Sequence, residues 1–277
     1  MSQSHPARAR LRRLALLFVG LGLALAATAG ETLRVSGTGS GVGGMQLLAK
    51  AFMSAHPAIK VDVLPAIGSS GGISALAAGN LELAVSNRPP NAKEAAQTAM
   101  TATEYARTPF VIVVHRDLGV TALSAQELAA LYADVPATFS NGKRARPVLR
   151  LDDSTDTRLL KSFSPEVAKA VDHAATRRGM LNAGTDSDAA DMVEKVPGAF
   201  AASTLALIES ERRPLVALAI DGKRASGASL AAGLYPFFKS LYWVTNANAA
   251  PATQQFVAFI GSPAARQLLS AHGHVPR

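Results

Sequence analysis

The sequence contains no cysteine among its 277 residues. Structural disulfides, thiolate metal sites, cysteine nucleophiles and a lipid anchored on cysteine are therefore excluded. Aromatic residues make up only 5% of the chain, and basic residues occur as scattered pairs such as Arg177-Arg178, so we expect no nucleic-acid partner. A His-Glu-x-x-His motif is also absent, and His272-x-His274 lies at an end that we expect to be frayed, with no third ligand nearby in sequence. The sequence thus predicts neither a metal nor a cofactor.

Long hydrophobic runs are limited to one, from Leu14 to Ala27, which four arginines precede. It is shorter than the ~20 residues that a membrane span needs, and Ala27-Thr28-Ala29 has the small-x-small pattern of a signal-peptidase site. We therefore predict a signal peptide over residues 1–29, cleaved near Ala29 and Gly30. The mature chain is expected in the periplasm and not inserted in a membrane. Loss of the four arginines lowers the formal net charge of +8 by four, and the remaining positive charge favours small anions.

Glycine and serine are concentrated in two short segments, Ser36–Gly41 and Gly68–Gly72. We call them the first and second glycine-serine segments. Each follows a strand-like run and opens onto a helix-like one. A helix that starts on such a segment presents unpaired N–H groups at the positive end of its dipole, and the small side chains let an anion approach the backbone. Two of these segments close together in sequence predict one shared oxyanion.

Apolar runs alternate with helical patterns in this part of the chain. Strands are predicted at Leu33–Ser36, Ile59–Leu64 and Leu83–Val85, and helices at Met45–Ala55 and Ile73–Ala78. The alternation indicates an open α/β sheet, in which ligands bind at the carboxyl edge of the strands. Both glycine-serine segments lie at that edge.

Two further apolar runs, Phe110–His115 and Phe237–Val244, are suited to crossing between two lobes. The mature length allows two modest domains, and no low-complexity linker separates them, so one domain must be inserted within the other. The predicted first lobe consists of residues 30–112 and 238–277. Residues 113–237 form the predicted inserted second lobe.

The segment Arg150–Arg158 gathers hydroxyls, carboxylates and arginines between a strand-like and a helix-like run. An ordinary polar turn with a helix N-cap accounts for it as well as a ligand-binding loop does. Two other motifs keep alternatives open. Gly39–Gly44 matches the dinucleotide pattern G-x-G-x-x-G, although Asp62 lies inside a strand rather than at its end. Gly68–Gly72 matches the nucleophile elbow G-x-S-x-G of serine hydrolases, with Ser70 as the nucleophile.

Five segments in a fixed order resemble the phosphate-binding proteins of ABC transporters (PstS-like), which are class II periplasmic solute-binding proteins. The segments are Ser36–Gly41, Gly68–Ile73, Glu82–Pro89, Arg150–Arg158 and Gly233–Pro236. The resemblance implies two hinged α/β lobes, each an open mixed sheet flanked by helices, with a ligand cleft between them. It also implies a monomeric, non-enzymatic protein that captures phosphate or a related tetrahedral oxyanion and delivers it to an ABC-transporter permease.

The resemblance also implies the site, position by position. Arg150 is expected to be the one full positive charge on the anion, with Asp152 holding its guanidinium in place. Hydroxyl and backbone N–H donors come from the two glycine-serine segments and from the helix start after Arg150. The predicted ligand-binding residues are Ser40, Gly41, Val42, Ser69, Asn87, Arg150, Asp152, Ser154, Thr155, Asp156 and Thr157.

The chain departs from the family pattern at two of these positions. Asn87 stands where an aspartate usually accepts the proton of hydrogen phosphate, and Asp156 stands where glycine is usual. Asp156 either takes over as the proton acceptor or repels the anion. The expected function is an exported solute-binding protein. The alternatives are a secreted serine hydrolase that uses Ser70, and a sensor or interaction domain of the same fold without transport.

Overall fold

Strands and helices alternate from the start of the described chain, as the hydrophobic pattern predicted. The computed structural model describes residues 31–133 and 136–277, of which Thr32–Arg277 form one compact unit; the predicted signal peptide lies outside the described residues. The three predicted strands are confirmed to within two residues at each end. The first elements are β1 (Glu31–Gly37), α1 (Gly39–Ala55), β2 (Ile59–Val63), α2 (Gly68–Ala77), β3 (Leu83–Ser86), α3 (Ala92–Ala95) and β4 (Met100–His115).

The remaining elements follow β4. They are β5 (Ala122–Leu123), α4 (Ala125–Ala133), β6 (Ala137–Thr138), β7 (Arg144–Arg150), α5 (Thr155–Lys161), α6 (Pro165–Ala175), β8 (Leu181–Ala183), α7 (Asp186–Lys195), β9 (Ala199–Thr204), α8 (Leu205–Ser210), β10 (Leu215–Ala217), β11 (Ala219–Ile220), α9 (Gly227–Ala231), β12 (Phe238–Asn246), α10 (Pro251–Ile260), α11 (Pro263–Ser270) and β13 (Val275–Pro276).

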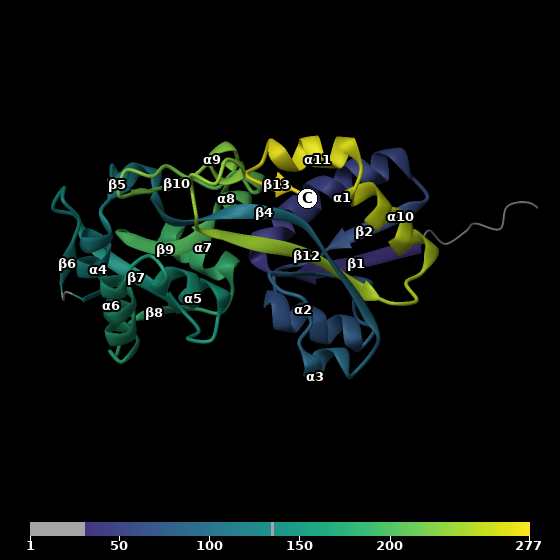
Figure 1. The fold of residues 1–277 in the computed structure, drawn as a ribbon, viewed down its shortest axis with the longest axis horizontal. Helices are drawn as coiled ribbons and strands as arrows, with labels where there is room; N and C mark the ends of the chain where they lie inside the picture. Colours follow the sequence, from purple (N-terminus) through teal and green to yellow (C-terminus); the bar gives the residue numbers. More distant parts are fainter. Residues whose placement is uncertain (1–30, 134–135) are drawn as a thin grey trace, which may run out of the picture. The chain divides into compact units, whose positions relative to one another are not determined.

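One mixed sheet connects most of these strands, in the order β2-β1-β3-β12-β4-β9-β7-β6. Strands β1 and β3 are parallel, whereas β12 is antiparallel to both of its neighbours, β3 and β4. Helices flank this sheet in Figure 1. The predicted α/β class with an open mixed sheet is therefore confirmed.

Strands β4 and β12 run side by side through the middle of the unit, as Figure 1 shows. Their pairing extends from Phe238 opposite Pro109 to Asn246 opposite Met100, and β4 continues beyond it to pair with β9. The continuation contains the fully buried run Phe110–Val114, whose branched and aromatic side chains suit a strand with both faces covered. These two strands therefore join the regions on either side of them.

Separate apolar clusters lie at the two ends of these strands. One includes side chains of β1, β3, α1, α10 and α11, among them Leu33, Phe52 and Phe256. Another includes side chains of β4, α4, α6 and β9, among them Tyr132 and Phe200. Full burial of one such side chain stabilises the fold by about 1.5–3 kcal/mol. We call the region around the former cluster the first lobe and the region around the latter the second lobe.

Both glycine-serine segments contain the first turn of a helix, so the predicted helix starts are wrong. Helix α1 begins at Gly39 instead of Met45, and α2 begins at Gly68 instead of Ile73. The extension of α1 depends on the absence of side chains at contacts with other elements. A Cβ atom on Gly41, for example, would lie 2.4 Å from Cγ1 of Val85. Packing thus outweighs the low helix propensity of glycine here.

The C-terminus is held by the sheet, contrary to the prediction of a frayed end. Strand β13 pairs with β4, and the backbone N–H of Arg277 donates to the carbonyl of Tyr105 at 2.9 Å. His274 is buried, and its Nδ1 lies 2.7 Å from the carbonyl oxygen of His272. Among residues 31–133 and 136–277, no helix combines the length and hydrophobicity that crossing a membrane requires.

Candidate functional site

The N-terminal ends of α1 and α7 meet between the two lobes. Their closest approach is at Gly39, where a Cβ atom would lie 2.6 Å from Oγ of Ser187 and 2.9 Å from Cβ of Asp186. Helix α7 starts after Thr185, whose side chain and that of Asp188 form a capping box. Asp186, the first residue of α7, is buried. Two positive helix ends therefore lie close to one buried carboxylate.

The carboxylate of Asp186 accepts hydrogen bonds from the first turn of α1. The backbone N–H of Ser40 donates to its Oδ2 at 2.9 Å, and the Ser40 hydroxyl makes a short contact with the same oxygen. The hydroxyl of Thr38 lies 3.1 Å from that oxygen and 2.6 Å from Oδ1 of Asn87. A backbone N–H and hydroxyls at a helix N-terminus form a typical site for an anion, and here a side chain of the protein occupies it.

Two buried cationic side chains also lie next to the Asp186 carboxylate. Nζ of Lys239 lies 3.2 Å from Oδ2 of Asp186 and 3.1 Å from Oγ of Ser40, and it contacts Oδ1 of Asp156. Nε of Arg150 lies 3.0 Å from Oδ2 of Asp156, and its Nη2 lies 3.4 Å from Oδ1 of Asp186. Arg150 also donates from Nη1 to the carbonyl of Ala183 at 2.7 Å.

We define the anion seat as the donors around Asp186: the backbone N–H and hydroxyl of Ser40, Nζ of Lys239 and Nη2 of Arg150, with the Thr38 hydroxyl beside them. The seat belongs to both lobes. Ser40 lies on α1, just after Thr38, and Lys239 lies on β12, whereas Arg150 lies at the end of β7. Together with Asp156 and Asp186, its two cations make a formally neutral group of four charges.

Burial and the neighbouring charges shift the protonation of this group. Burial, followed by the negative charge of Asp186, raises the pKa of Asp156 to about 6. Burial also acts to raise the pKa of Asp186, but Lys239, Asp156, Arg150 and Ser40 outweigh it and hold that pKa well below its ordinary range. For Lys239, the attraction of Asp156 and Asp186 outweighs burial and raises the pKa. Asp186 and Lys239 are therefore both charged at neutral pH.

Asn87 links the second glycine-serine segment to the seat. The backbone N–H of Asn87 donates to Oγ of Ser69 at 3.0 Å, and the Asn87 amide donates to the carbonyl of Ser240 at 3.3 Å. Asn87 Oδ1 then accepts from Thr38, which contacts Asp186. The structure thus brings Ser40, Asn87, Arg150 and Asp156 together, with Ser69 one residue further from the seat.

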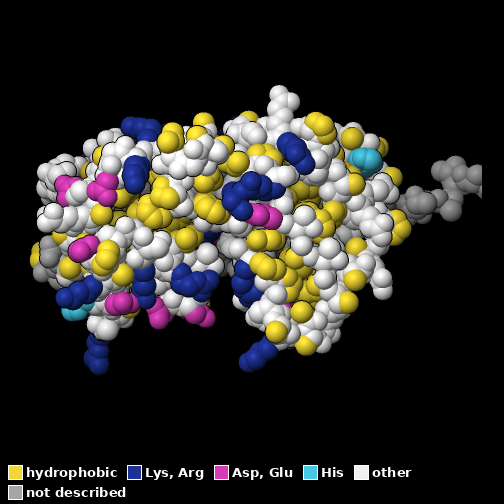
Figure 2. All heavy atoms as spheres, viewed as in Figure 1, with side chains coloured by type: hydrophobic (Ala, Val, Ile, Leu, Met, Phe, Trp, Pro, Cys, Tyr) yellow, Lys and Arg dark blue, Asp and Glu magenta, His cyan; other side chains and the backbone are white. Residues whose placement is uncertain are grey.

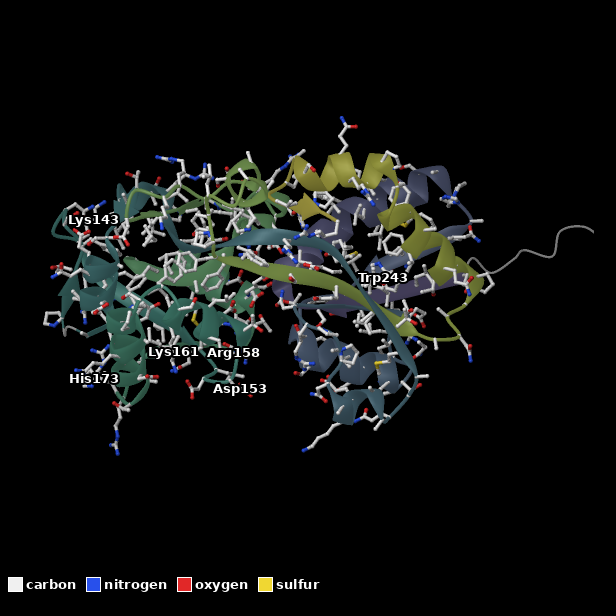
Figure 3. All side chains as sticks on the ribbon, in the orientation of Figure 1. Lys143, Asp153, Arg158, Lys161, His173 and Trp243 are labelled. Carbon is white, nitrogen blue, oxygen red and sulfur yellow. The ribbon has the colours of Figure 1, made fainter. Side chains whose placement is uncertain are left out.

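The expected contact between Asp152 and Arg150 is wrong. Asp152 is exposed, and its carboxylate lies 2.8 Å from Nζ of Lys161, while Arg150 contacts Asp156. The reason is that α5 begins at Thr155, which places Asp156 in its first turn and leaves Asp152 in the exposed turn before it. Figure 3 shows Asp153, Arg158 and Lys161 gathered at the nearby edge of the second lobe.

The remaining predicted donors are engaged within their own segments. Ser154 is the N-cap of α5 and accepts from the backbone N–H of Thr157 at 3.1 Å. The Thr157 hydroxyl donates to the carbonyl of Leu151 at 2.8 Å, and Nη2 of Arg158 donates to the Thr155 hydroxyl at 3.2 Å. The interpretation of this segment as a polar turn with a helix cap accounts for these contacts.

In the first glycine-serine segment, the backbone N–H groups of Gly41 and Val42 both donate to the carbonyl of Thr38, at 3.0 and 3.2 Å. The described structure does not place them on the seat.

The key residues of the serine-hydrolase and dinucleotide motifs contact basic side chains. At 2.9 Å, the Ser70 hydroxyl accepts from Nη2 of Arg88, which is a cation and not a histidine base. Asp62, the candidate ribose ligand, is paired with Lys60 at 2.9 Å. No group of three or more metal-ligating side chains occurs within residues 31–133 and 136–277.

Sequence reasoning missed three residues of the site: Thr38, Asp186 and Lys239. Lys239 carried a signal, because it is the only charged residue in the apolar run Phe237–Val244. Asp186 follows Thr185 at the start of a helix after a short strand, the arrangement that also marks an ordinary cap. Thr38 lies within a segment that was identified, but its hydroxyl had no assigned role.

Comparisons with known proteins identify the family. Residues 24–264 match a family described as a PBP superfamily domain. No curated protein matches the sequence.

Solved structures with this fold include three that are informative. A protein from Clostridium perfringens, described as a candidate phosphate ABC transporter substrate-binding protein with bound phosphate, has a TM-score of 0.72 at 16% identity, over 89% of this chain and 100% of that one. An ABC-type phosphate transport receptor from Vibrio cholerae has a TM-score of 0.58 at 20% identity, over 89% and 100%. The CcmR regulatory domain from Synechocystis with 2-PG has a TM-score of 0.53 at 15% identity, over 83% and 96%.

At these identities the likeness establishes the two-lobed fold and leaves the ligand open. The family match covers most of the chain and agrees with the mixed sheet and its two crossing strands. The chain therefore belongs to the PBP superfamily, whose fold it shares with substrate-binding proteins of phosphate ABC transporters.

Proposed function

We propose that this chain is an exported, non-enzymatic solute-binding protein that captures phosphate or a related tetrahedral oxyanion in the anion seat and serves an ABC importer. The observation that carries the proposal is the seat itself, in which Ser40, Lys239 and Arg150 surround one anionic group. A tetrahedral oxyanion needs several directed donors, and an arginine fork pairs strongly with it. The phosphate-bound structure with the same fold supports this ligand class.

The two lobes provide a mechanism for capture. Because the seat takes donors from both, an anion bound there stabilises the closed arrangement, which a membrane permease can then recognise. We propose lobe boundaries at residues 30–112 with 238–277 and at 113–237; most side chains of the two apolar clusters fall on the matching sides, although Phe110 and Ile112 pack in the cluster of the second lobe. Figure 2 shows the surface hollowed between the parts that carry α5 and α2, with Lys and Arg side chains on both rims. The mature protein acts as a periplasmic monomer in this proposal.

Asp156 is the proton acceptor for the ligand in this scheme. Asn87 carries an amide in place of a carboxylate, and its Oδ1 already accepts from Thr38. Asp156 is buried and touches both cations of the seat, so it lies close enough to accept the proton of hydrogen phosphate. Phosphate should then outcompete sulfate, which is fully ionised and offers no proton.

A sensor without transport is the second candidate. It is favoured by one observation, the regulatory domain that shares this fold and was solved with 2-PG. A co-purification of the chain with a membrane permease supports transport, and retention by a soluble regulator supports the sensor.

The direct test is isothermal titration with phosphate, sulfate and molybdate up to millimolar concentration. We expect saturable binding that Arg150→Ala abolishes and Arg150→Lys restores only in part, because an ammonium lacks the planar fork. Arg158→Ala is the matched control, since that arginine lies in the same segment and is exposed. Unchanged affinity in Arg150→Ala would exclude the seat as the binding site.

A further inference from the structure

The anion seat already holds a carboxylate that belongs to the protein. We propose that Asp186 is a tethered competitor of the external oxyanion: its side chain fills the seat in the ligand-free protein and sets both the affinity and the charge of the ligand that can enter. The inference rests on the proposed function, because it assumes that an external anion binds at this seat.

Asp186 uses the donors that an external oxyanion would need. Its Oδ2 accepts from the backbone N–H of Ser40 at 2.9 Å and lies 3.2 Å from Nζ of Lys239, while its Oδ1 lies 3.4 Å from Nη2 of Arg150. The Ser40 hydroxyl also contacts it. These groups converge on Asp186, so an external anion can reach them only after that carboxylate leaves.

Burial leaves no room for both anions. Asp186 is 5% exposed, Ser40 1% and Lys239 2%. The backbone of Gly39 is so close to α7 that even a methyl group would approach Cβ of Asp186 to 2.9 Å. Because Asp186, Ser40 and Lys239 are buried and in direct contact, a phosphate group cannot reach these donors while the carboxylate stays in place.

Charge leads to the same conclusion. Lys239 and Arg150 balance Asp156 and Asp186, so the occupied seat is formally neutral. Adding a dianion without removing Asp186 would leave two uncompensated negative charges in a buried site, which is strongly unfavourable. With Asp186 outside the seat, the two cations exceed Asp156 by one, and the site attracts an anion.

The fold allows Asp186 to leave without loss of α7. The helix is capped by Thr185, which accepts from the backbone N–H of Asp188, and by Asp188, which accepts from the backbone N–H of Thr185. Asp186 takes no part in this capping box. Its neighbours Thr185, Ser187 and Asp188 line an open cavity of ≈ 590 Å³ with Val42 and Gln46 of α1. An open cavity therefore adjoins the residues on both sides of Asp186.

A competitor of this kind weakens the apparent affinity, because the external anion binds only to molecules in which the seat is empty. The apparent Kd is the intrinsic Kd divided by the fraction of such molecules. A tethered group also acts at a high effective concentration. Removal of the carboxylate should therefore tighten binding of inorganic oxyanions, whereas for an ordinary ligand contact removal would weaken it. The sign of the change distinguishes the two roles.

The experiment measures the Kd of inorganic phosphate and sulfate for the full mature chain, for Asp186→Ala and for Asp186→Asn. We expect the phosphate Kd of Asp186→Ala to fall at least about ten-fold, equivalent to ~1.4 kcal/mol. Formate should raise the melting temperature of Asp186→Ala by restoring a carboxylate to the seat, and should leave the unmodified protein unchanged. Asp188→Asn is the matched control, because it removes an exposed negative charge from the same helical turn while keeping an oxygen that can accept the N–H of Thr185.

Each outcome of these measurements supports or overturns the role of Asp186 as a tethered competitor. Tighter phosphate binding in Asp186→Ala, with Asp188→Asn unchanged, supports the tethered competitor. Equal phosphate affinity in the unmodified protein and Asp186→Ala overturns it and leaves the proposed function intact. If no oxyanion binds any of the proteins, the proposed function fails and the inference with it. Should Asp186→Ala not fold without ligand, Asp186→Asn keeps the side-chain shape, and its failure to gain phosphate affinity would equally overturn the inference.

Discussion

The two glycine-serine segments look alike in sequence and differ in the structure. The first begins α1, whose end is buried against α7 and holds the carboxylate of Asp186. The second begins α2, where Gly68 has open space around its Cα and the neighbouring Ile67 is exposed. Ser69 and Ser70 bond to Asn87 and Arg88 of their own lobe. A helix start becomes an anion site only where tertiary contacts bury it and supply cations.

The difference shows how burial changes the strength of interactions between charged side chains. At the first segment, Lys239 and Arg150 act on a carboxylate with water excluded, so each interaction is strong and each loss is costly. At the second, Arg88 pairs with Glu94 of α3 at 2.6 Å in a partly exposed setting. Such pairs contribute about 0–1 kcal/mol when exposed. The following predictions test that contrast.

Lys239→Met should lower the stability of the protein more than any other change proposed here. It leaves Asp156 and Asp186 buried with only Arg150 to balance them, and removal of one partner from a buried ionic group costs about 3–5 kcal/mol. Urea unfolding at neutral pH measures it. Lys161→Met is the control, because Lys161 pairs only with the exposed Asp152 and Asp172, and it should cost about 0–1 kcal/mol. Equal losses in the two variants would show that the first segment is not energetically distinct.

Stability should also depend on pH through Asp156. Its pKa is raised to about 6 in the folded state from an ordinary value of 3.8, so the folded state holds that proton more tightly than the unfolded state. The resulting stabilisation is complete below pH 4 and is lost as pH rises through about 6. It amounts to about 1–3 kcal/mol.

The check is to follow the free energy of unfolding from pH 4 to 7 in the unmodified protein and in Asp156→Asn. The difference between them should shift in favour of Asp156→Asn as pH rises. Asp152→Asn removes an exposed carboxylate from the same segment and serves as the control. A constant difference across this pH range would contradict the prediction.

Glycine-to-alanine substitutions should change the stability of the protein in opposite directions in the two segments. Gly39→Ala places Cβ 2.6 Å from Oγ of Ser187 and 2.9 Å from its backbone nitrogen, forcing α1 from α7 at a cost of about 1–3 kcal/mol. Gly71→Ala meets only ordinary contacts, the closest being Cβ of Ile67 at 3.4 Å, so it should stabilise α2 by about 0.5–1 kcal/mol. Thermal unfolding of both variants measures the difference. A stabilising Gly39→Ala would show that the closed contact at α7 is not maintained in solution.

The smallest difference in stability between the two segments is expected when one serine hydroxyl is removed from each. Ser40→Ala removes a hydroxyl bonded to a carboxylate and should cost about 1.5–3 kcal/mol. Ser69→Ala removes the acceptor for the Asn87 N–H, a neutral and partly exposed bond worth about 0.5–1.5 kcal/mol. Chemical unfolding of the two variants in parallel measures both costs. A larger loss of stability in Ser69→Ala than in Ser40→Ala would contradict the contrast.

Local pattern was sufficient for much of the fold. The strands β1, β2 and β3 follow from short apolar runs, and the crossing parts of β4 and β12 follow from the longer apolar runs Phe110–His115 and Phe237–Val244. The helix starts failed because glycine has a low helix propensity in isolation, and only the packing of Gly39 and Gly41 explains a helix there. The docked C-terminus was missed because β13 has two residues and no pattern of its own.

The sequence, through its resemblance to a known family, predicted that Ser40, Asn87, Arg150 and Asp156 share one site, and the fold brings these four residues together. Only the tertiary structure decided what occupies that site. Asp186 is 146 residues from Ser40, and Lys239 is 199 residues from it. A lone aspartate at a helix start and a lone lysine in a strand resemble a cap and a surface residue, respectively. Their roles arise because folding brings them into one buried volume, where each charge must find a partner.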